Sequence, residues 1–230
     1  MTFAPSVFCF GLRAYTEIML RTMHPKRLII LRHAETVKNK QGKHGGGDET
    51  LTKHGLAQLD DIAKQLVRLT GSSQHALFSQ PDLRCLHSVS VLASKLGAHA
   101  QVIDELRGIN MGVVAGLSDV QLAVRHPLVA LSYLQWRAGS SLHRPHIQGA
   151  ESIKDFAERS LHGLQELLKV ENVNTIIFVG TTSGLLMLNH FLLHDGQFDR
   201  RDYRFYELDF GELATWQLSS DNPPRLLPNT

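Results

Sequence analysis

Two reactive side chains, Arg32 and His33, follow a short apolar run near the start of the sequence. Residues 28–31 read Leu-Ile-Ile-Leu, which has the length and β-branching of a buried strand. Arginine offers a planar fork of donors that suits a phosphate group, and histidine offers a ring nitrogen that can attack phosphorus or carry a proton. An α/β fold commonly holds its active site at the carboxyl end of such a strand. The pair alone also fits a solvated loop, so the residues around it must decide.

The string from Arg32 to Asn39 reads Arg-His-Ala-Glu-Thr-Val-Lys-Asn. It resembles the signature of the histidine phosphatase superfamily, also called phosphoglycerate mutase-like, which is Arg-His-Gly/Ala-Glu-Thr/Ser-x-x-Asn after the first strand. The resemblance implies a phosphoryl-transfer site in which His33 attacks phosphorus and becomes a phosphohistidine. It implies no cofactor. The implied partner is a small phosphorylated molecule or inorganic phosphate.

Further matches to the family supply phosphate-binding residues. Arg32 and Arg84 match the two phosphate clamps, and the string Ser-Gln-Pro-Asp-Leu-Arg that ends at Arg84 is similar to the family's Ser-x-x-x-x-Arg at a helix start. A helix N-terminus there would add backbone donors for an anion. Thr36 and Asn39 match polar positions that line the pocket. Residues 51–58 resemble Leu-Thr-x-x-Gly-x-x-Gln, which supports the fold.

The acid of the family pattern is absent. The family carries Glu-x-x-x-Gly, in which the glutamic acid protonates the leaving alcohol. Gly112 and Gly116 match the glycine anchors of this region, and they place Gly108 where the glutamate is expected. Glu105 and Asp104 lie three and four residues earlier. Either could supply the acid if the loop is rebuilt, with Glu105 as the first candidate, and otherwise each is a solvated carboxylate.

The second histidine of the family is also absent. Family members end a late buried strand with Val-Ser-His-Gly, whereas the apolar strand of residues 176–179 continues here as Gly-Thr-Thr-Ser-Gly. Thr181 therefore takes the place of the histidine. A threonine can donate a hydrogen bond to phosphate but carries no positive charge. His190 lies nine residues further on in an apolar stretch and is predicted to pack within a helix.

Three functions remain open. In the first, a phosphate or phosphoester binds at Arg32, His33 and Arg84, and phosphatase activity is weak or lost. In the second, the chain is a working phosphomonoester hydrolase whose acid is Glu105 or Asp104. In the third, it is a non-catalytic interaction protein on the same fold. A general acid contributes about 10²–10⁴-fold and one electrostatic donor about 10²–10³-fold, so losing both favours the first function.

The elements that must position these residues alternate along the chain, which predicts an α/β fold. We expect a three-layer sandwich with a mainly parallel central sheet and helices on both faces. Strands are expected over 26–31, 75–79, 98–103, 174–180, 205–210 and 213–218, the last two as edge or antiparallel strands. Helices are expected over 53–70, 82–96, 118–125, 128–137, 152–170 and 184–193. The strands 26–31 and 174–180 should be central neighbours, because both end in motif residues that must converge.

Length and composition predict one domain. The chain has 230 residues, 43% of them hydrophobic, which is enough for one sizeable core over residues 26–230. Residues 1–25 are expected to form an extension outside it. The two cysteines, Cys9 and Cys85, lack metal or redox spacing, which favours a reducing, cytoplasmic location. No stretch approaches the ~20 apolar residues of a membrane span.

The charge is close to balanced, with a formal net value of +2. This is too small to favour nucleic acid or an acidic membrane surface as a partner. Lys26, Arg27 and Arg32 form a local cationic cluster, which we interpret as attracting an anionic substrate. The thirteen histidines are scattered, so no metal site is predicted. The sequence leaves the oligomeric state open.

Overall fold

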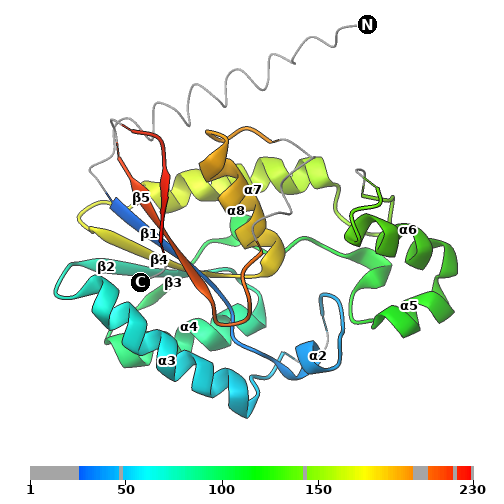
Figure 1. The fold of residues 1–230 in the computed structure, drawn as a ribbon, viewed down its shortest axis with the longest axis horizontal. Coiled ribbons are helices and arrows are strands. Elements are labelled where there is room, and N and C mark those ends of the chain that lie inside the picture. Colours follow the sequence, from blue (N-terminus) through cyan, green and yellow to red (C-terminus); the bar gives the residue numbers. More distant parts are fainter. Residues whose placement is uncertain (1–25, 47–48, 142–143, 199–206, 220–221, 229–230) are drawn as a thin grey trace, which may run out of the picture.

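The computed structural model describes residues 26–228 except 47–48, 142–143, 199–206 and 220–221. Its centre is a mixed sheet with the strand order β3-β2-β4-β1-β5-β6 (Figure 1). The strands are β1 Lys26–Arg32, β2 His75–Ser79, β3 Ala100–Val102, β4 Thr175–Gly180, β5 Leu213–Leu218 and β6 Arg225–Leu227. The first four are parallel to one another, whereas β5 is antiparallel to β1 and β6 to β5. The predicted mainly parallel α/β sheet is confirmed.

The side chains of β1 explain why helices cover both faces of this sheet. Successive side chains of a strand point to opposite faces, so a fully apolar run needs cover on both. Ile29 and Leu31 pack in one cluster with α3 (Lys53–Thr70) and α4 (Leu83–Leu96). Leu28 and Ile30 pack in another with α7 (Ile153–Leu168) and α8 (Thr182–Leu193). Figure 1 shows the two pairs of helices on opposite sides of the strands.

The register between β1 and β4 places the motif residues at one edge. The two strands run parallel, with Arg27 opposite Thr175 and Arg32 opposite Gly180. His33 then donates its backbone N–H to the Gly180 carbonyl at 3.0 Å. The predicted central pairing is therefore confirmed, and both strands end at the same side of the molecule.

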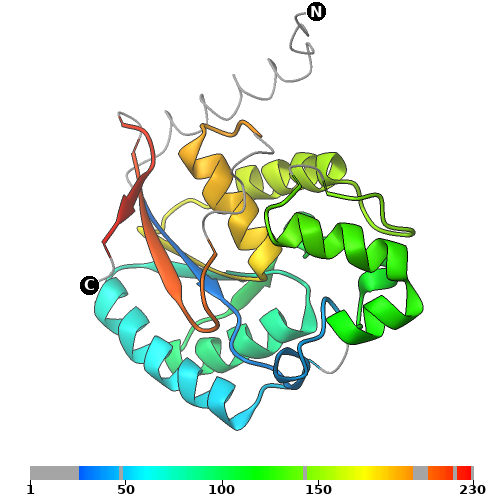
Figure 2. The same cartoon turned by 45° about the vertical axis from the view of Figure 1, so that its right-hand side comes forward.

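A small helical lobe lies beside that edge (Figures 1 and 2). It contains η2 (Gly112–Val114), α5 (Asp119–Arg125) and α6 (Pro127–Arg137). Pro127 is the first residue of α6, a position where the missing N–H costs no helical hydrogen bond. The lobe has its own buried apolar cluster of Val114, Leu117, Leu122, Ala130, Tyr133 and Ile147. Two short elements complete the description: α2 (Val37–Lys40) and η1 (Asp104–Leu106).

The prediction of a strand over 205–210 is wrong at residues 207–210. Residues 205 and 206 lie outside the described residues, and 207–210 form a loop and turn instead of a strand. The backbone N–H of Glu212 donates to the Asp209 carbonyl at 2.9 Å, and Gly211 adopts a φ of +72°. This tight turn leads into β5, so residues 207–210 do not join the sheet. The short strand β6 was not predicted.

The prediction that Lys26, Arg27 and Arg32 form one cationic cluster is also wrong. Lys26 and Arg27 lie at the amino end of β1, and Arg32 lies at its carboxyl end. The Lys26 ammonium donates to the Val170 carbonyl, and Arg27 Nη1 donates to the Leu69 carbonyl at 2.5 Å. An entire strand separates these side chains from Arg32, so the three residues do not form one attracting surface.

Candidate functional site

A cleft of about 620 Å³ opens where β1 and β4 end, between the sheet and the helical lobe. Five sequence-predicted residues line it together: Arg32, His33, Asn39, Arg84 and Thr181. They come from the ends of β1 and β4, from α2 and from the first turn of α4. The chain segments that carry the family motifs therefore converge at one place.

His33 is held as a neutral imidazole. Its side chain is buried, and Nδ1 lies 2.9 Å from the carbonyl oxygen of Ala34. A carbonyl can only accept, so Nδ1 carries the hydrogen and Nε2 keeps the lone pair. Burial and the nearby charge of Arg84 lower the pKa of His33 to about 3. A neutral ring with a lone pair on Nε2 is the form that can attack phosphorus.

Arg32 is fixed in position by residues 207–210, which lie just before β5 in the chain. Its guanidinium carbon lies 3.7 Å from the centroid of the Phe210 ring. Nη1 donates to the Leu208 carbonyl at 2.5 Å and lies 3.5 Å from the Glu207 carboxylate. Among the described residues, no acceptor reaches the buried Nε. Burial lowers the pKa of Arg32, though three carboxylates oppose this shift.

Arg84 is held by two carboxylates. Its guanidinium pairs with Glu49, and its Nη2 lies 3.0 Å from Oδ1 of Asp82. The same Glu49 accepts the backbone N–H of Arg84 at 3.0 Å. Lys38 lies 3.8 Å from Glu49 and is buried, and its pKa is lowered to about 8 chiefly by burial. The cations at this end of the cleft are thus partly neutralised by the protein itself.

The remaining signature residues hold the segment after His33 in place through hydrogen bonds of their own. Asn39 Oδ1 accepts from the backbone N–H and the hydroxyl of Thr36, at 3.0 and 2.6 Å. Asn39 lines the cleft, whereas Thr36 is fully buried and does not line it. Thr52 Oγ1 donates to Glu35 at 2.6 Å. A Cβ on Gly55 would lie 2.3 Å from the Glu35 carbonyl, so only glycine permits this close approach.

Gly108 faces the cleft where the family acid is expected. A Cβ added to it would lie 3.0 Å from Asp82 Oδ1, 3.3 Å from Thr181 Oγ1 and 3.5 Å from Arg84 Nη2. Its loop is anchored by Gly112, whose φ is +55° and whose Cβ would lie 2.2 Å from the Gln148 carbonyl. The glycine anchors therefore fix the loop, and they bring position 108 into the site.

The two carboxylates expected to replace the acid lie elsewhere. Asp104 pairs with Arg107 at 3.4 Å on the surface, and its side chain is 75% exposed. The Cβ of Glu105 lies against Gly163 of α7. Neither residue lines the cleft. Arg159 of α7 donates hydrogen bonds to the carbonyl groups of residues 105, 107 and 108, and these bonds fix loop 104–108 in this position.

Arg159 of α7 forms the centre of this clamp. Its Nε and Nη2 bind the two oxygens of Glu151 at 2.6 and 2.7 Å. Its Nη1 donates to the carbonyls of Glu105 and Arg107 at 2.7 and 2.8 Å, and Nη2 reaches the Gly108 carbonyl at 3.2 Å. One side chain thus ties the loop that carries Gly108 to the long helix.

Thr181 acts as the N-cap of α8. Its side chain accepts from the backbone N–H of Gly184, and its own N–H donates to Gln80 Oε1 at 2.7 Å. This capping role explains how a threonine fits the place of the family's second histidine. His190 is fully buried within α8, packed against His194 and Phe198, and does not line the cleft.

Comparison with known proteins decides the family. A model of the histidine phosphatase superfamily (branch 1) matches residues 28–214, which include every motif described above. The chain belongs to the histidine phosphatase superfamily. A bifunctional protein of Mycobacterium tuberculosis is 27% identical over 173 residues, which cover 75% of this chain and 45% of that protein. The chain thus spans less than half of the length of that relative.

Solved structures share the fold of this histidine phosphatase superfamily member. The alpha-ribazole phosphatase of Shigella flexneri has a TM-score of 0.68 and 21% identity, covering 83% of this chain and 89% of that one. A mycobacterial glucosyl-3-phosphoglycerate phosphatase, solved with VO3, has a TM-score of 0.70 and 22% identity, covering 87% and 96%. A phosphoserine phosphatase of Entamoeba histolytica, solved with 3-phosphoglyceric acid, has a TM-score of 0.67 and 20% identity, covering 88% and 95%.

Sequence reasoning missed three charged residues of this histidine phosphatase site: Lys38, Glu49 and Asp82. Lys38 falls on a variable position of the signature, and Glu49 follows a glycine-rich stretch, so no pattern marks either one. Asp82 left a signal, because it stands two residues before Arg84 within the matched string. Only the folded chain shows that Glu49 and Asp82 contact Arg84 and that Lys38 lies 3.8 Å from Glu49.

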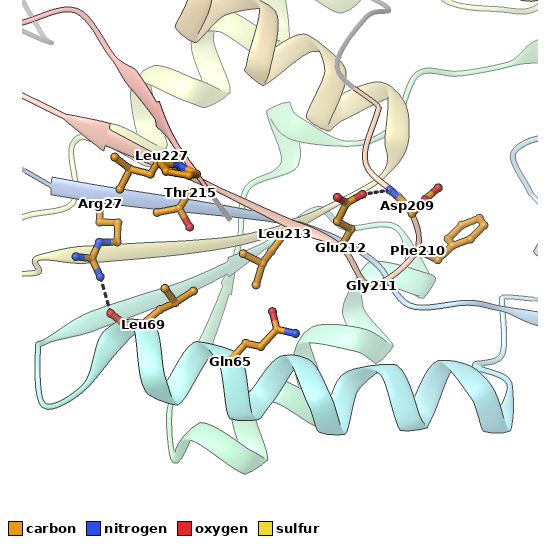
Figure 3. A pocket seen from close by; sticks show the side chains of 11 residues that line it. Arg27, Gln65, Leu69, Asp209, Phe210, Gly211, Glu212, Leu213, Thr215 and Leu227 are labelled. Carbon is orange, nitrogen blue, oxygen red and sulfur yellow. Dashed lines mark hydrogen bonds between the residues drawn. The ribbon is translucent and has the colours of Figure 1, made fainter. Parts of the chain in front are cut away.

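A second cavity, of about 500 Å³, lies along α3 and β5 (Figure 3). Its walls include Gln65, Leu213 and Thr215. Its charged groups are engaged locally: Arg27 with the Leu69 carbonyl, and Glu212 with the Asp209 N–H at 2.7 Å. No motif residue for phosphoryl transfer lies in it, so the cleft at His33 is the candidate active site.

Within the described ranges, no group of three histidine, cysteine or carboxylate side chains is arranged to hold a metal ion. In the same part of the chain, none of the helices has the length and apolar character needed to cross a bilayer.

Proposed function

We propose that this histidine phosphatase superfamily member binds the phosphate group of a small phosphorylated molecule at Arg32, His33 and Arg84, and hydrolyses it slowly. The observation that carries the proposal is the neutral His33, whose Nδ1 is engaged by Ala34. This leaves Nε2 available in a cleft that also holds both arginines. The fold's neighbours include phosphatases of small molecules, which supports the same ligand class.

The two arginines support the binding step. Arg32 and Arg84 both line the cleft, and a guanidinium group can donate two parallel hydrogen bonds to a phosphate. Two guanidinium groups at one end of the cleft suit a tetrahedral oxyanion.

Aromatic side chains suggest what the rest of the ligand is like. Tyr133, Trp136 and Phe156 line the cleft beyond the arginines. Large aromatic walls favour an apolar or flat organic group on the phosphate. The cleft is open enough to hold such a group. The interaction-protein alternative would gain support if side chains filled this pocket, and it lacks that support here.

Slow hydrolysis follows from what the site lacks. Thr181 brings no positive charge to the phosphate, and Gly108 brings no carboxylic acid. Each group contributes about two orders of magnitude or more in comparable sites, although such losses need not multiply. The cytoplasmic location inferred from the cysteines stays a prediction, as do the exclusion of nucleic acid and membrane partners.

Calorimetry with orthovanadate tests the binding site. The wild type should bind, and Arg32→Ala should bind at least about tenfold more weakly, because a charge-assisted pair is worth about 1.5–3 kcal/mol. Arg68→Ala, which removes the same charge from the exposed face of α3, should bind as the wild type does. Equal affinities for the wild type and Arg32→Ala would exclude this pocket.

A further inference from the structure

We propose that Asp82 is the proton donor to the leaving oxygen in this chain, replacing the glutamic acid that Gly108 lacks. The inference rests on the proposed function, because it requires a phosphoester bound beside His33. Hydrolysis stays slow, because Thr181 still brings no positive charge to the phosphate, but the acid is a different residue from Glu105 and Asp104.

The geometry around Gly108 carries the proposal. The first side-chain atom of a residue at position 108 would lie 3.0 Å from Asp82 Oδ1. The space in which the family's acid would begin is therefore already next to a carboxylate. The same point lies 3.3 Å from Thr181 Oγ1 and 3.5 Å from Arg84 Nη2. The Asp82 carboxylate thus borders Gly108, Thr181 and Arg84, which line the cleft, although it is not itself one of the lining residues.

Two hydrogen bonds hold the Asp82 carboxylate in place. Oδ2 accepts the backbone N–H of Gly108 at 2.9 Å, and Oδ1 accepts from Arg84 Nη2 at 3.0 Å. The side chain is 19% exposed, so it is largely enclosed yet open to proton exchange. A catalytic group must be fixed to within a small tolerance, and contacts to the Gly108 loop and to the first turn of α4 provide that.

Glu49 also contacts Arg84, but it suits the role less well. Its carboxylate meets the guanidinium and the backbone N–H of Arg84, and Lys38 lies 3.8 Å away. These contacts hold Glu49 against the side chain and backbone of Arg84. The atoms nearest to a Cβ at position 108 belong instead to Asp82, Thr181 and Arg84. Asp82 is therefore the carboxylate that lies where the family's acid would begin.

The proposed reaction balances as follows. Nε2 of His33 attacks phosphorus, the bond from phosphorus to the leaving oxygen breaks, and its electron pair goes to that oxygen. The carboxylic acid of Asp82 gives its proton to the oxygen, which leaves as the alcohol. Water then attacks the phosphohistidine, the Asp82 carboxylate takes the water proton, and the bond from phosphorus to nitrogen breaks. Phosphate and neutral His33 are the products.

Asp82→Asn is the first test, because the amide can still accept from Gly108 but cannot donate an acidic proton. Two substrates are compared: glycerol phosphate, whose alcohol needs protonation, and 4-nitrophenyl phosphate, whose phenolate can leave unaided. The kcat for glycerol phosphate should fall by about 10²-fold or more, and that for 4-nitrophenyl phosphate much less. Equal losses for both substrates, or no loss, would overturn the proposal.

Vanadate binding separates this role from a positioning role. Asp82→Asn should keep or strengthen the affinity for orthovanadate, because Arg84 loses a negative neighbour. A loss of affinity as large as the loss of turnover would assign Asp82 to holding Arg84 and would overturn the proposal. Absence of vanadate binding by the wild type would instead refute the proposed function itself. If the wild type binds orthovanadate but hydrolyses neither ester, the phosphate-binding site is supported and the role of Asp82 as proton donor is overturned.

A paired substitution provides an independent test. The 3.0 Å approach predicts that Asp82 crowds a glutamate placed at position 108. Gly108→Glu should therefore lower or barely change glycerol phosphate turnover in the wild type and raise it in Asp82→Ala. Residues that share a site show such non-additive effects. The same fold-change in both backgrounds would show that the two positions are not coupled and would overturn the exchange.

Discussion

The Glu49 carboxylate binds both the guanidinium and the backbone N–H of Arg84, the latter at 3.0 Å. The second contact is at the first turn of α4, where backbone donors have no partner within the helix. An acidic side chain of the protein thus occupies donors that would otherwise meet a phosphate. The affinity of the site for anions therefore depends on how easily an anion displaces the Glu49 carboxylate from Arg84.

We therefore expect Glu49→Gln to strengthen phosphate binding. The amide keeps an acceptor for the Arg84 N–H but removes a negative charge that opposes the ligand. An increase of about tenfold in the affinity for orthovanadate, measured by calorimetry, corresponds to about 1.4 kcal/mol. Asp61→Asn removes the same charge from an exposed pair with Lys64 and should change nothing. An unchanged affinity in Glu49→Gln would mean that the anion does not use these donors.

A second prediction concerns the nucleophile. Any hydrolysis of 4-nitrophenyl phosphate should pass through a phosphohistidine at His33, because Nε2 is the available lone pair. His33→Gln should reduce the rate to background. Rapid denaturation in alkali during turnover should trap an alkali-stable phosphoryl group on the peptide that contains residue 33. A phosphoryl group found on a different peptide would contradict the assignment of His33 as the nucleophile.

The low pKa of His33 gives a third prediction, on stability. The pKa is about 3 in the folded chain and about 6.5 in the unfolded chain. Between these values the unfolded state binds more protons, so this contribution to stability is lost as the pH falls from about 6.5 toward 3. At about pH 5, the loss should be about 2 kcal/mol relative to neutral pH.

Urea unfolding of the wild type and His33→Gln at several pH values measures this contribution. The other titrating groups are shared, so the difference between the two proteins isolates the imidazole. The variant should lose less stability on acidification than the wild type. Parallel curves for the two proteins would show that His33 is not buried in its neutral form.

A fourth prediction concerns the clamp on the Gly108 loop. Arg159→Lys cannot bind both oxygens of Glu151 and the loop carbonyls together, since an ammonium lacks the planar fork. The free energy of unfolding should fall by about 1.5–3 kcal/mol, the contribution of a hydrogen bond to a charged group, because the positive charge itself is kept. Lys154→Ala, an exposed residue of the same helix, should cost far less. Hydrogen exchange should rise at residues 105–110 in Arg159→Lys alone.

A fifth prediction uses the fluorescence of Trp136. The sequence contains two tryptophans, and Trp216 is buried with its indole N–H bonded to Asn189 at 2.9 Å. Because Trp136 lines the cleft, 4-nitrophenyl phosphate should quench its emission, whereas glycerol phosphate should not. The quenching should disappear in Trp136→Phe. Quenching that persists in that variant would place the aromatic ligand elsewhere.

The sequence determined the frame of this protein through local patterns. Four apolar residues in succession required a strand covered on both faces, and β1 is that strand. Thr52, Ser118 and Ser152 cap the helices that follow them. Because these signals act between residues close in the chain, they also placed Arg32, His33, Arg84 and Thr181 on known elements.

Tertiary structure decided what surrounds those residues. Glu49 contacts Arg84, and Lys38 contacts Glu49, only because α2, the segment at Glu49 and the start of α4 fold together there. Glu105 does not line the cleft, and Arg159 on α7 binds its carbonyl. Charge interactions depend on distance in space and on burial, and neither can be read from the order of residues. The sequence could therefore predict His33 as the nucleophile, and only the fold could show which carboxylates contact Arg84.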